Sequence, residues 1–150
     1  MSTAKRMKDR RKVKNGKYTK MTLNLMSTPA WRALSTKAQA LYIWLKLEWK
    51  GPKRNNNGTI SLSCREAATK MSVTPNTAAA GFRELQKKGF IVVTRPSFLG
   101  TEGEARLQLY EITELVMPGS KAPRHLYAKW KEGSDFEVIA PAKTETRIKK

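Results

Sequence analysis

Apolar side chains in residues 36–49 recur at the spacing of one face of a helix. They stand at positions i, i+3, i+4, i+7 and i+11: Ala38, Leu41, Tyr42, Leu45 and Trp49. This spacing has the α-helical period, Ser35 before it is a suitable N-cap, and Gly51-Pro52 after it stops a helix. Thr28-Pro29 has a cap-plus-proline form that opens a short helical turn ahead of the main helix. We therefore predict a short turn and then a helix over 36–49.

Two further helices are predicted by their capping sequences. Ser63 and the glutamate three residues later form a capping box, so a helix begins there and runs to about Met71. Thr74-Pro75 repeats the cap-plus-proline start for a helix over Pro75–Lys88, and Gly89 ends that helix in the left-handed conformation. Because only a short turn separates them, these two helices form a helix-turn-helix.

After the helices the pattern changes to that of β-strands. Residues 90–95 are rich in β-branched side chains, and residues 105–112 alternate like an antiparallel partner. The loop over 96–104 between them contains two glycines, which predicts a hairpin with a long tip. A short β-like segment over 59–62 precedes the second helix, and the polar run over 53–58 is interpreted as a surface turn.

The positive charge is concentrated at the two ends of the chain. The 150 residues hold 30 Lys and Arg against 12 Asp and Glu, a formal net charge of +18. Residues 1–20 carry nine basic side chains and one acidic, and residues 142–150 carry four and one, so these ends hold +8 and +3. We expect a basic arm over 1–20, a folded domain over 21–113, an extension over 114–141, and a basic tail over 142–150. Both ends are expected to stay disordered until a polyanion neutralises them, unless they serve solubility alone.

Few residue types for catalysis or metal binding are available. One Cys and one His exclude a disulfide framework, a Cys-based zinc cluster and a His-rich metal site. No phosphate-binding glycine-rich loop or nucleophile–base arrangement is present, so we expect no metal, no cofactor, no small-molecule ligand and no enzymatic activity. No apolar run approaches the roughly 20 residues of a bilayer span, and we expect a cytoplasmic protein without a membrane partner. The charge favours polyanions, with nucleic acid ahead of an anionic membrane surface.

Four stretches share the pattern of a known family: Leu34-Ser35, Cys64–Ala68, Met71–Ala78 and Arg83–Ile91. With the order of the predicted elements, they resemble the winged-helix branch of helix-turn-helix DNA-binding proteins, in particular small bacterial, phage and plasmid regulators and replication-initiator-like proteins. The resemblance covers about residues 28–113. The last stretch is the most specific, because a charged helix end, a glycine and two apolar residues mark the junction from recognition helix to wing. The implied fold is α+β, a three-helix core with a β-hairpin wing.

The resemblance implies that Pro75–Lys88 lies in the major groove of double-stranded DNA, as in a sequence-specific transcriptional regulator. By position, the base-reading residues would be Thr74, Pro75, Asn76, Thr77, Ala79, Ala80 and Arg83. Asn76 can pair with adenine, and Arg83 can reach guanine or a phosphate. Phosphate contacts from the arm, the helices and the wing would be Arg10, Arg11, Lys12, Ser63, Arg65, Lys70, Lys87, Arg95 and Arg106.

Other functions stay open because the start of the recognition helix, residues 75–81, carries no charge. Direct base readout is then modest, with the arms and wing supplying much of the affinity. A plasmid or phage replication initiator and a non-specific nucleic-acid-binding protein are alternatives, and a phage-type protein that binds a host protein is another.

Several side chains have more than one interpretation from sequence. Gly81 indicates either close packing against another helix or a helix backbone that lies close to the DNA. Phe98 and Leu99 at the hairpin tip fold back, join a second subunit or wedge into a groove. Tyr127 and Trp130 dock on the domain or on a second copy in a homodimer. Cys64 is expected to be a half-buried structural thiol rather than one activated by the helix terminus.

Overall fold

Serine and threonine caps begin the helices where their sequences place them. The computed structural model describes residues 16–99 and 105–140. The helices are α2 (Leu23–Met26), α3 (Pro29–Arg32), α4 (Thr36–Lys46), α5 (Cys64–Met71), α6 (Pro75–Lys87) and the 3₁₀ helix η1 (Leu126–Lys129). The hydroxyls of Thr28, Ser35, Ser63 and Thr74 each accept a hydrogen bond from the amide three residues ahead. The predicted helical turn, the three main helices and the capping box are therefore confirmed, and α2 is an addition.

The helix α4 ends at Lys46, three residues before the predicted end. Asparagine side chains bond the backbone that would have continued it: Asn56 Oδ1 accepts from the Lys50 amide at 2.8 Å, and Asn56 Nδ2 donates to the Glu48 carbonyl at 3.1 Å. The indole of Trp49 donates to Asn55 Oδ1 at 2.8 Å. These bonds favour a turn over another helical turn.

The run over 53–58 is more than the surface turn predicted for it. Asn57 is 2% exposed, and its side chain accepts from the Ile112 amide at 2.7 Å and donates to the carbonyls of Ile112 and Leu115. Asn55 Nδ2 donates to the Val116 carbonyl at 2.9 Å. The asparagines thus fasten this segment to the last strand and to the chain that follows it.

The strands are β1 (Ile91–Arg95), β2 (Phe98–Leu99), β3 (Ala105–Arg106) and β4 (Leu109–Ile112). β1 pairs antiparallel with β4, with Val93 opposite Tyr110, and β2 pairs with β3. A register shift between Val93 and Arg95 divides the hairpin, so the predicted partner strand over 105–112 is broken in two. The β-like segment over 59–62 contributes a single bridge, between Ile60 and Tyr110.

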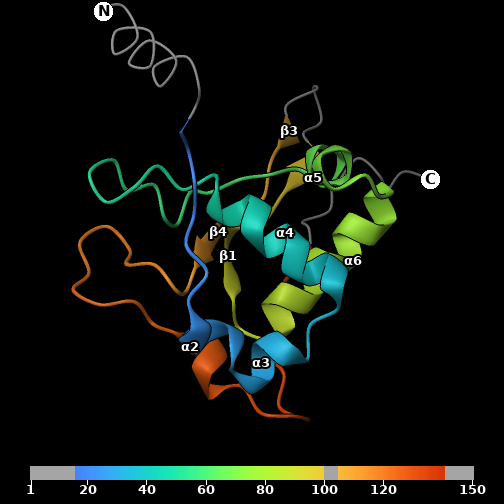
Figure 1. Cartoon of the computed structure of the whole chain (residues 1–150). Coiled ribbons are helices and arrows are strands. Elements are labelled where there is room, and N and C mark those ends of the chain that lie inside the picture. The colour runs from blue at the N-terminus through green and yellow to red at the C-terminus, as the bar shows by residue number, and fades with distance from the viewer. Residues whose placement is uncertain (1–15, 100–104, 141–150) are drawn as a thin grey trace, which may run out of the picture.

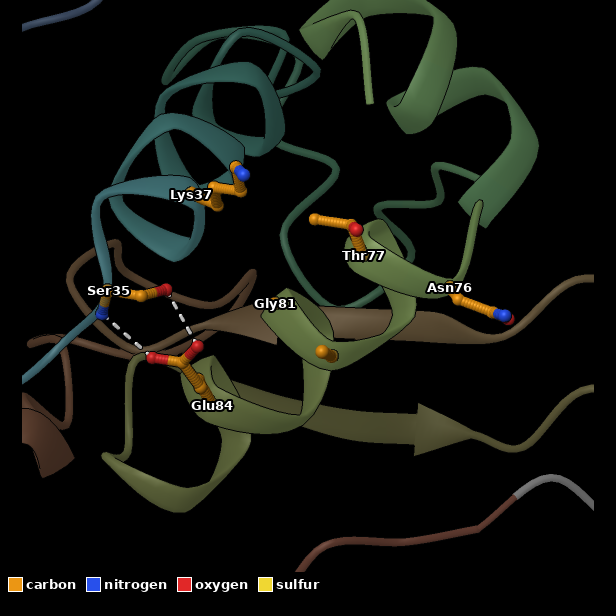
Figure 2. A pocket seen from close by; sticks show the side chains of 7 residues that line it. Ser35, Lys37, Asn76, Thr77, Gly81 and Glu84 are labelled. Carbon is orange, nitrogen blue, oxygen red and sulfur yellow. Dashed lines mark hydrogen bonds between the residues drawn. The ribbon is translucent and has the colours of Figure 1, made fainter. Parts of the chain in front are cut away.

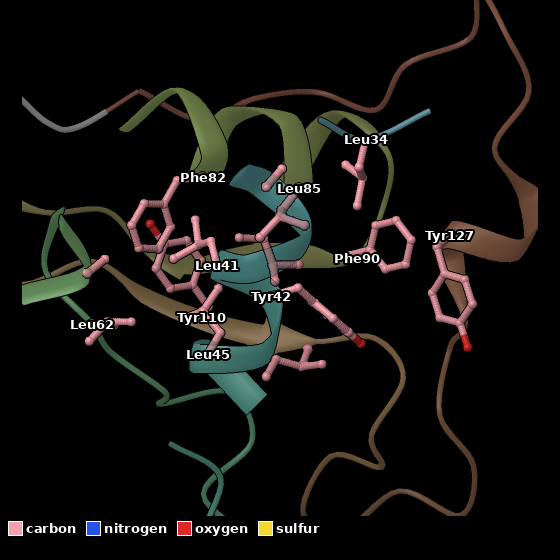
Figure 3. Close-up of a cluster of buried hydrophobic side chains, with 14 of the residues drawn as sticks. Leu34, Leu41, Tyr42, Leu45, Leu62, Phe82, Leu85, Phe90, Tyr110 and Tyr127 are labelled. Atoms are coloured by element: carbon pink, nitrogen blue, oxygen red, sulfur yellow. The ribbon is translucent and has the colours of Figure 1, made fainter. Parts of the chain in front are cut away.

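Aromatic rings from distant parts of the chain fill the core (Figure 3). Phe90 makes edge contacts with Trp31 and Tyr42, at 5.8 and 5.2 Å between ring centroids, and stacks on Tyr127 at 4.9 Å. Tyr127 and Trp130 are both buried. The extension therefore docks on its own domain, which resolves the alternative left open by the sequence, and Trp31 and Tyr42 both belong to the core.

Figure 1 shows α4 across the centre, with α6 on one side of it, α2 and α3 near the lower edge, and β3 near the upper edge. Within the described ranges, no helix is long and apolar enough to cross a membrane.

Candidate nucleic-acid interface

One stripe along α6 faces away from the core. Asn76, Ala80, Arg83 and Lys87 follow one another at spacings of four, three and four, which place them on a single helix face. Asn76, Arg83 and Lys87 are exposed and Ala80 is half-buried, whereas Ala78, Phe82 and Leu85 on the opposite face are buried. Within the described part of the chain, the outer side of α6 is therefore open to a partner.

A side-chain clamp fixes α6 against the start of α4. The Glu84 carboxylate accepts hydrogen bonds from the Ser35 amide at 2.8 Å and from the Ser35 hydroxyl at 2.7 Å, shown as dashed lines in Figure 2. Charge-assisted bonds of this kind are stronger than neutral ones. The clamp also places the one acidic residue of α6 on its flank, beside the stripe rather than on it.

The two helices also approach each other closely at Gly81. A Cβ on this residue would lie 3.1 Å from Leu41 Cδ2, closer than ordinary packing allows. Packing against a neighbouring helix therefore explains the glycine, and of the two interpretations from sequence this is the one the structure supports.

Between the start of α4 and α6 lies an open hollow of about 340 Å³. Its lining residues are Ser35, Lys37, Asn76, Thr77, Ala80, Gly81 and Glu84. In Figure 2 Asn76 points away from α4, while Thr77 and Lys37 lie on the sides of the hollow. The hollow adjoins the stripe, so an occupant of one would border the other.

The remaining base-reading candidates differ in their exposure and in their hydrogen bonds. Thr74 caps α6 by accepting from the Thr77 amide at 3.2 Å, and the two threonine hydroxyls lie 3.0 Å apart and bond each other. Pro75 is exposed, whereas Ala79 is half-buried. Of the seven predicted residues, Asn76 and Arg83 thus combine exposure with a polar group that makes no hydrogen bond in the described structure.

The phosphate candidates on α5 lie at its two ends. Ser63 caps the helix and shares its hydroxyl with Glu66, and Arg65 is exposed in the first turn. Burial raises the pKa of the Cys64 thiol, against the opposing charge of Arg83, so the cysteine is a half-buried structural thiol and Arg83 lies near the start of α5. Lys70, at the far end, stands over the ring of Trp44 at 5.2 Å.

Cations also lie on the hairpin. The Arg95 Nη2 donates to the Leu107 carbonyl at 2.9 Å, while its Nε is buried without an acceptor. The exposed Arg106 covers the ring of Phe98, with 5.3 Å from guanidinium carbon to centroid, so Phe98 packs on its own hairpin. Leu107, which sequence reasoning passed over, is 48% exposed.

Two groups of predicted residues remain, those at the chain ends and Lys87 at the end of α6. Arg10, Arg11 and Lys12 lie outside the described residues, as does the tail over 142–150. Lys87, at the end of α6, is exposed, and its carbonyl accepts from the Phe136 amide at 2.9 Å. The Ile139 amide donates to Gln86 Oε1 at 3.0 Å. The segment that contains Phe136 and Ile139 runs beside α6 and was not predicted there, because it has no periodic pattern.

No family model, curated protein or solved structure matches this chain.

Proposed function

We propose that the chain binds double-stranded DNA with the outer stripe of α6 in the major groove. The observation that carries this proposal is the stripe itself: it is exposed, it bears Asn76, Arg83 and Lys87 without a carboxylate, and α4 holds it from behind. A major groove is wide enough to admit an α-helix. The order of α4, α5, α6 and the β1–β4 hairpin supports a winged-helix arrangement, in which α6 is the recognition helix.

Within this arrangement the four stripe residues have different roles. Asn76 at the first turn presents an amide that matches the paired donor and acceptor of adenine. Arg83, two turns further on, reaches guanine or a phosphate, and the Ala80 methyl between them can contact a thymine methyl. Lys87 at the end of the helix meets the backbone.

We assign further phosphate contacts to Arg65 on α5 and Arg106 on the hairpin, which are both exposed, together with the charges of the two basic ends. Neutralising six to eight phosphates gives a slope of about −5 to −7 for the logarithm of the binding constant against that of salt concentration. Lys70 contributes only if it leaves the ring of Trp44.

The test compares duplex binding by the natural chain and three full-length variants. Arg83→Ala and Asn76→Ala remove stripe groups, and Lys129→Gln removes an exposed charge on η1 as a control. Fragments selected by the natural chain from a random duplex pool supply the specific site, and fluorescence anisotropy measures affinity against salt. We expect Asn76→Ala to lose selectivity at one base pair, worth about 1–3 kcal/mol, and the control to keep it. Equal affinity for all duplexes and no effect of either stripe variant would refute the proposal.

A second candidate is sequence-independent binding. It is favoured by the threonine pair, since Thr74 and Thr77 bond each other and leave few polar groups to read bases. Under this function, selection returns no common site, and removal of residues 1–15 abolishes nearly all binding. The whole affinity is then electrostatic and depends on salt concentration. Under the first function, some selectivity survives that deletion at low salt. A site recovered by selection would also decide between regulator and replication initiator, once its genomic position is known.

A further inference from the structure

A basic loop follows α4 at the end remote from α6. Lys50, Lys53 and Arg54 are all exposed, and no acidic residue lies between Lys50 and the start of α5. The ion pairs in the described ranges, Lys46 with Glu114 and Arg124 with Glu111, involve none of these three. Three uncompensated cations within five residues form a local positive field.

Hydrogen bonds from asparagine side chains fix the shape of this loop. Asn56 closes it by bonding the Lys50 amide and the Glu48 carbonyl, and Asn55 joins it to Trp49 and to Val116. A chain held at both ends loses little conformational freedom when its side chains meet a ligand. The loop therefore presents its cations on a fixed support, unlike a charge run in a free tail.

The loop lies on the other side of the molecule from the stripe. The α4 helix is 11 residues long, which corresponds to about 16 Å. Ser35, at its start, touches α6 through Glu84, and the basic loop begins four residues past its end. In Figure 1 the loop between α4 and α5 projects on the left, while α6 occupies the right. A ligand on the stripe of α6 and a ligand on the loop therefore approach the domain at opposite ends of α4.

The N-terminal segment joins the fold next to the same loop. Lys46 Nζ donates to the Lys20 carbonyl, and Lys46 is the last residue of α4, four residues before Lys50. The Lys20 side chain is exposed, and Tyr18 nearby is 77% exposed. Lys20 and Tyr18 thus join the cations of the loop in one region with an exposed aromatic ring, a composition typical of nucleic-acid contacts.

We propose that Lys50, Lys53 and Arg54 bind the phosphate backbone of a second nucleic-acid segment, so that one copy of the chain bridges two duplexes. This inference rests on the proposed function, because α6 holds the first duplex. The loop has no groove-reading helix, so the second contact is independent of sequence. Loss of two of its phosphate contacts lowers the salt slope of the second binding step by about 1.8, and weakens that step by as much as about 60-fold at ~0.1 M salt.

The experiment uses two duplexes and full-length protein. One duplex, carrying the selected site, is fixed to beads, and a second labelled duplex of unrelated sequence is then added. Bead capture of the label reports bridging, while anisotropy with the specific duplex alone reports the first step. The loop variant is K53Q/R54Q, and K129Q/K131Q removes the same charge from exposed positions near η1 as a matched control.

We expect the natural chain and the control to capture the labelled duplex, and the loop variant to lose capture while keeping its affinity for the specific duplex within about threefold. Normal binding of the first duplex without capture of the second would overturn this inference and leave the proposed function standing. Absence of any duplex binding would overturn both.

Two further results would contradict a role of the loop in bridging duplexes. Capture that persists in the loop variant would show that bridging arises from self-association or from the terminal arms. A parallel sedimentation assay with vesicles of anionic lipid distinguishes the other polyanion. If K53Q/R54Q loses vesicle binding while duplex capture is unchanged, the loop binds membranes and the inference is wrong.

Discussion

Replacing Gly81 by alanine tests how closely α6 is packed against α4. The new methyl would lie 3.1 Å from Leu41 Cδ2 and 3.7 Å from Ala38 Cα. Alanine gains about 1 kcal/mol of helix propensity over glycine. Leu41 is completely buried, however, and cannot move aside without disturbing the core. Overpacking of this kind costs about 1–3 kcal/mol, so we expect Gly81→Ala to lower the free energy of unfolding by about 1 kcal/mol.

A double-mutant cycle separates the two contributions. Leu41→Ala removes the crowded methyl and costs about 2–5 kcal/mol alone. In that background Gly81→Ala meets no obstacle and should stabilise the protein by about 1 kcal/mol. The sign of the Gly81→Ala effect therefore reverses between the two backgrounds, and urea denaturation followed by circular dichroism measures it. Stabilisation by Gly81→Ala in the natural background would refute the close packing argued here.

Three other changes give measurable outcomes. Glu84→Gln weakens the bonds to Ser35 and removes a negative charge beside the stripe. We therefore expect the free energy of unfolding to fall by about 1 kcal/mol, measured by urea denaturation, and duplex affinity to rise at low salt, measured by anisotropy. Unchanged affinity would count against a duplex on this face. Asn57→Ala leaves the buried amide of Ile112 without an acceptor and should lower the free energy of unfolding by about 2–3 kcal/mol in the same denaturation assay. An unchanged free energy of unfolding would show that this side chain does not hold the segment over 53–58. Burial raises the pKa of Tyr110 and of Tyr127 from the usual 10.0 to about 12, so the neutral rings favour the folded state. That stability is complete below pH 10 and is lost as the pH rises towards 12. Tyrosinate absorbance during alkaline unfolding checks this, and Tyr127→Phe should flatten the dependence.

The helix starts could be predicted because their causes are local. A cap such as Ser63 and its glutamate lie three residues apart and bond each other without help from the rest of the chain. The outer stripe of α6 follows equally from its periodicity, which places Ala78, Phe82 and Leu85 inside.

Other features depend on partners far away in the sequence. Asn57 reads as a turn residue, and its burial becomes evident only when Ile112 is placed beside it. The pairing of Thr74 with Thr77 is local. That the two hydroxyls bond each other, and so are not free to bond a base, becomes evident only from their positions in the structure. The path of residues 133–140 beside α6 has no signal in the sequence at all, because isolated contacts such as Phe136 with Gly89 hold it.

The anchoring of the chain ends gives the two proposals a common physical basis. The Lys46 ammonium holds the N-terminal segment at Lys20, on the side of the basic loop. Gln86 holds Ile139, so the last described residue, Ala140, leaves the domain beside α6. We therefore expect the charges of residues 1–15 to strengthen the loop contact more, and those of residues 142–150 to strengthen the stripe contact more. Removing the C-terminal tail should therefore weaken the first duplex contact more than the second, and removing the N-terminal arm should do the reverse. Equal effects of both deletions on both steps would mean that the ends act as unplaced charge.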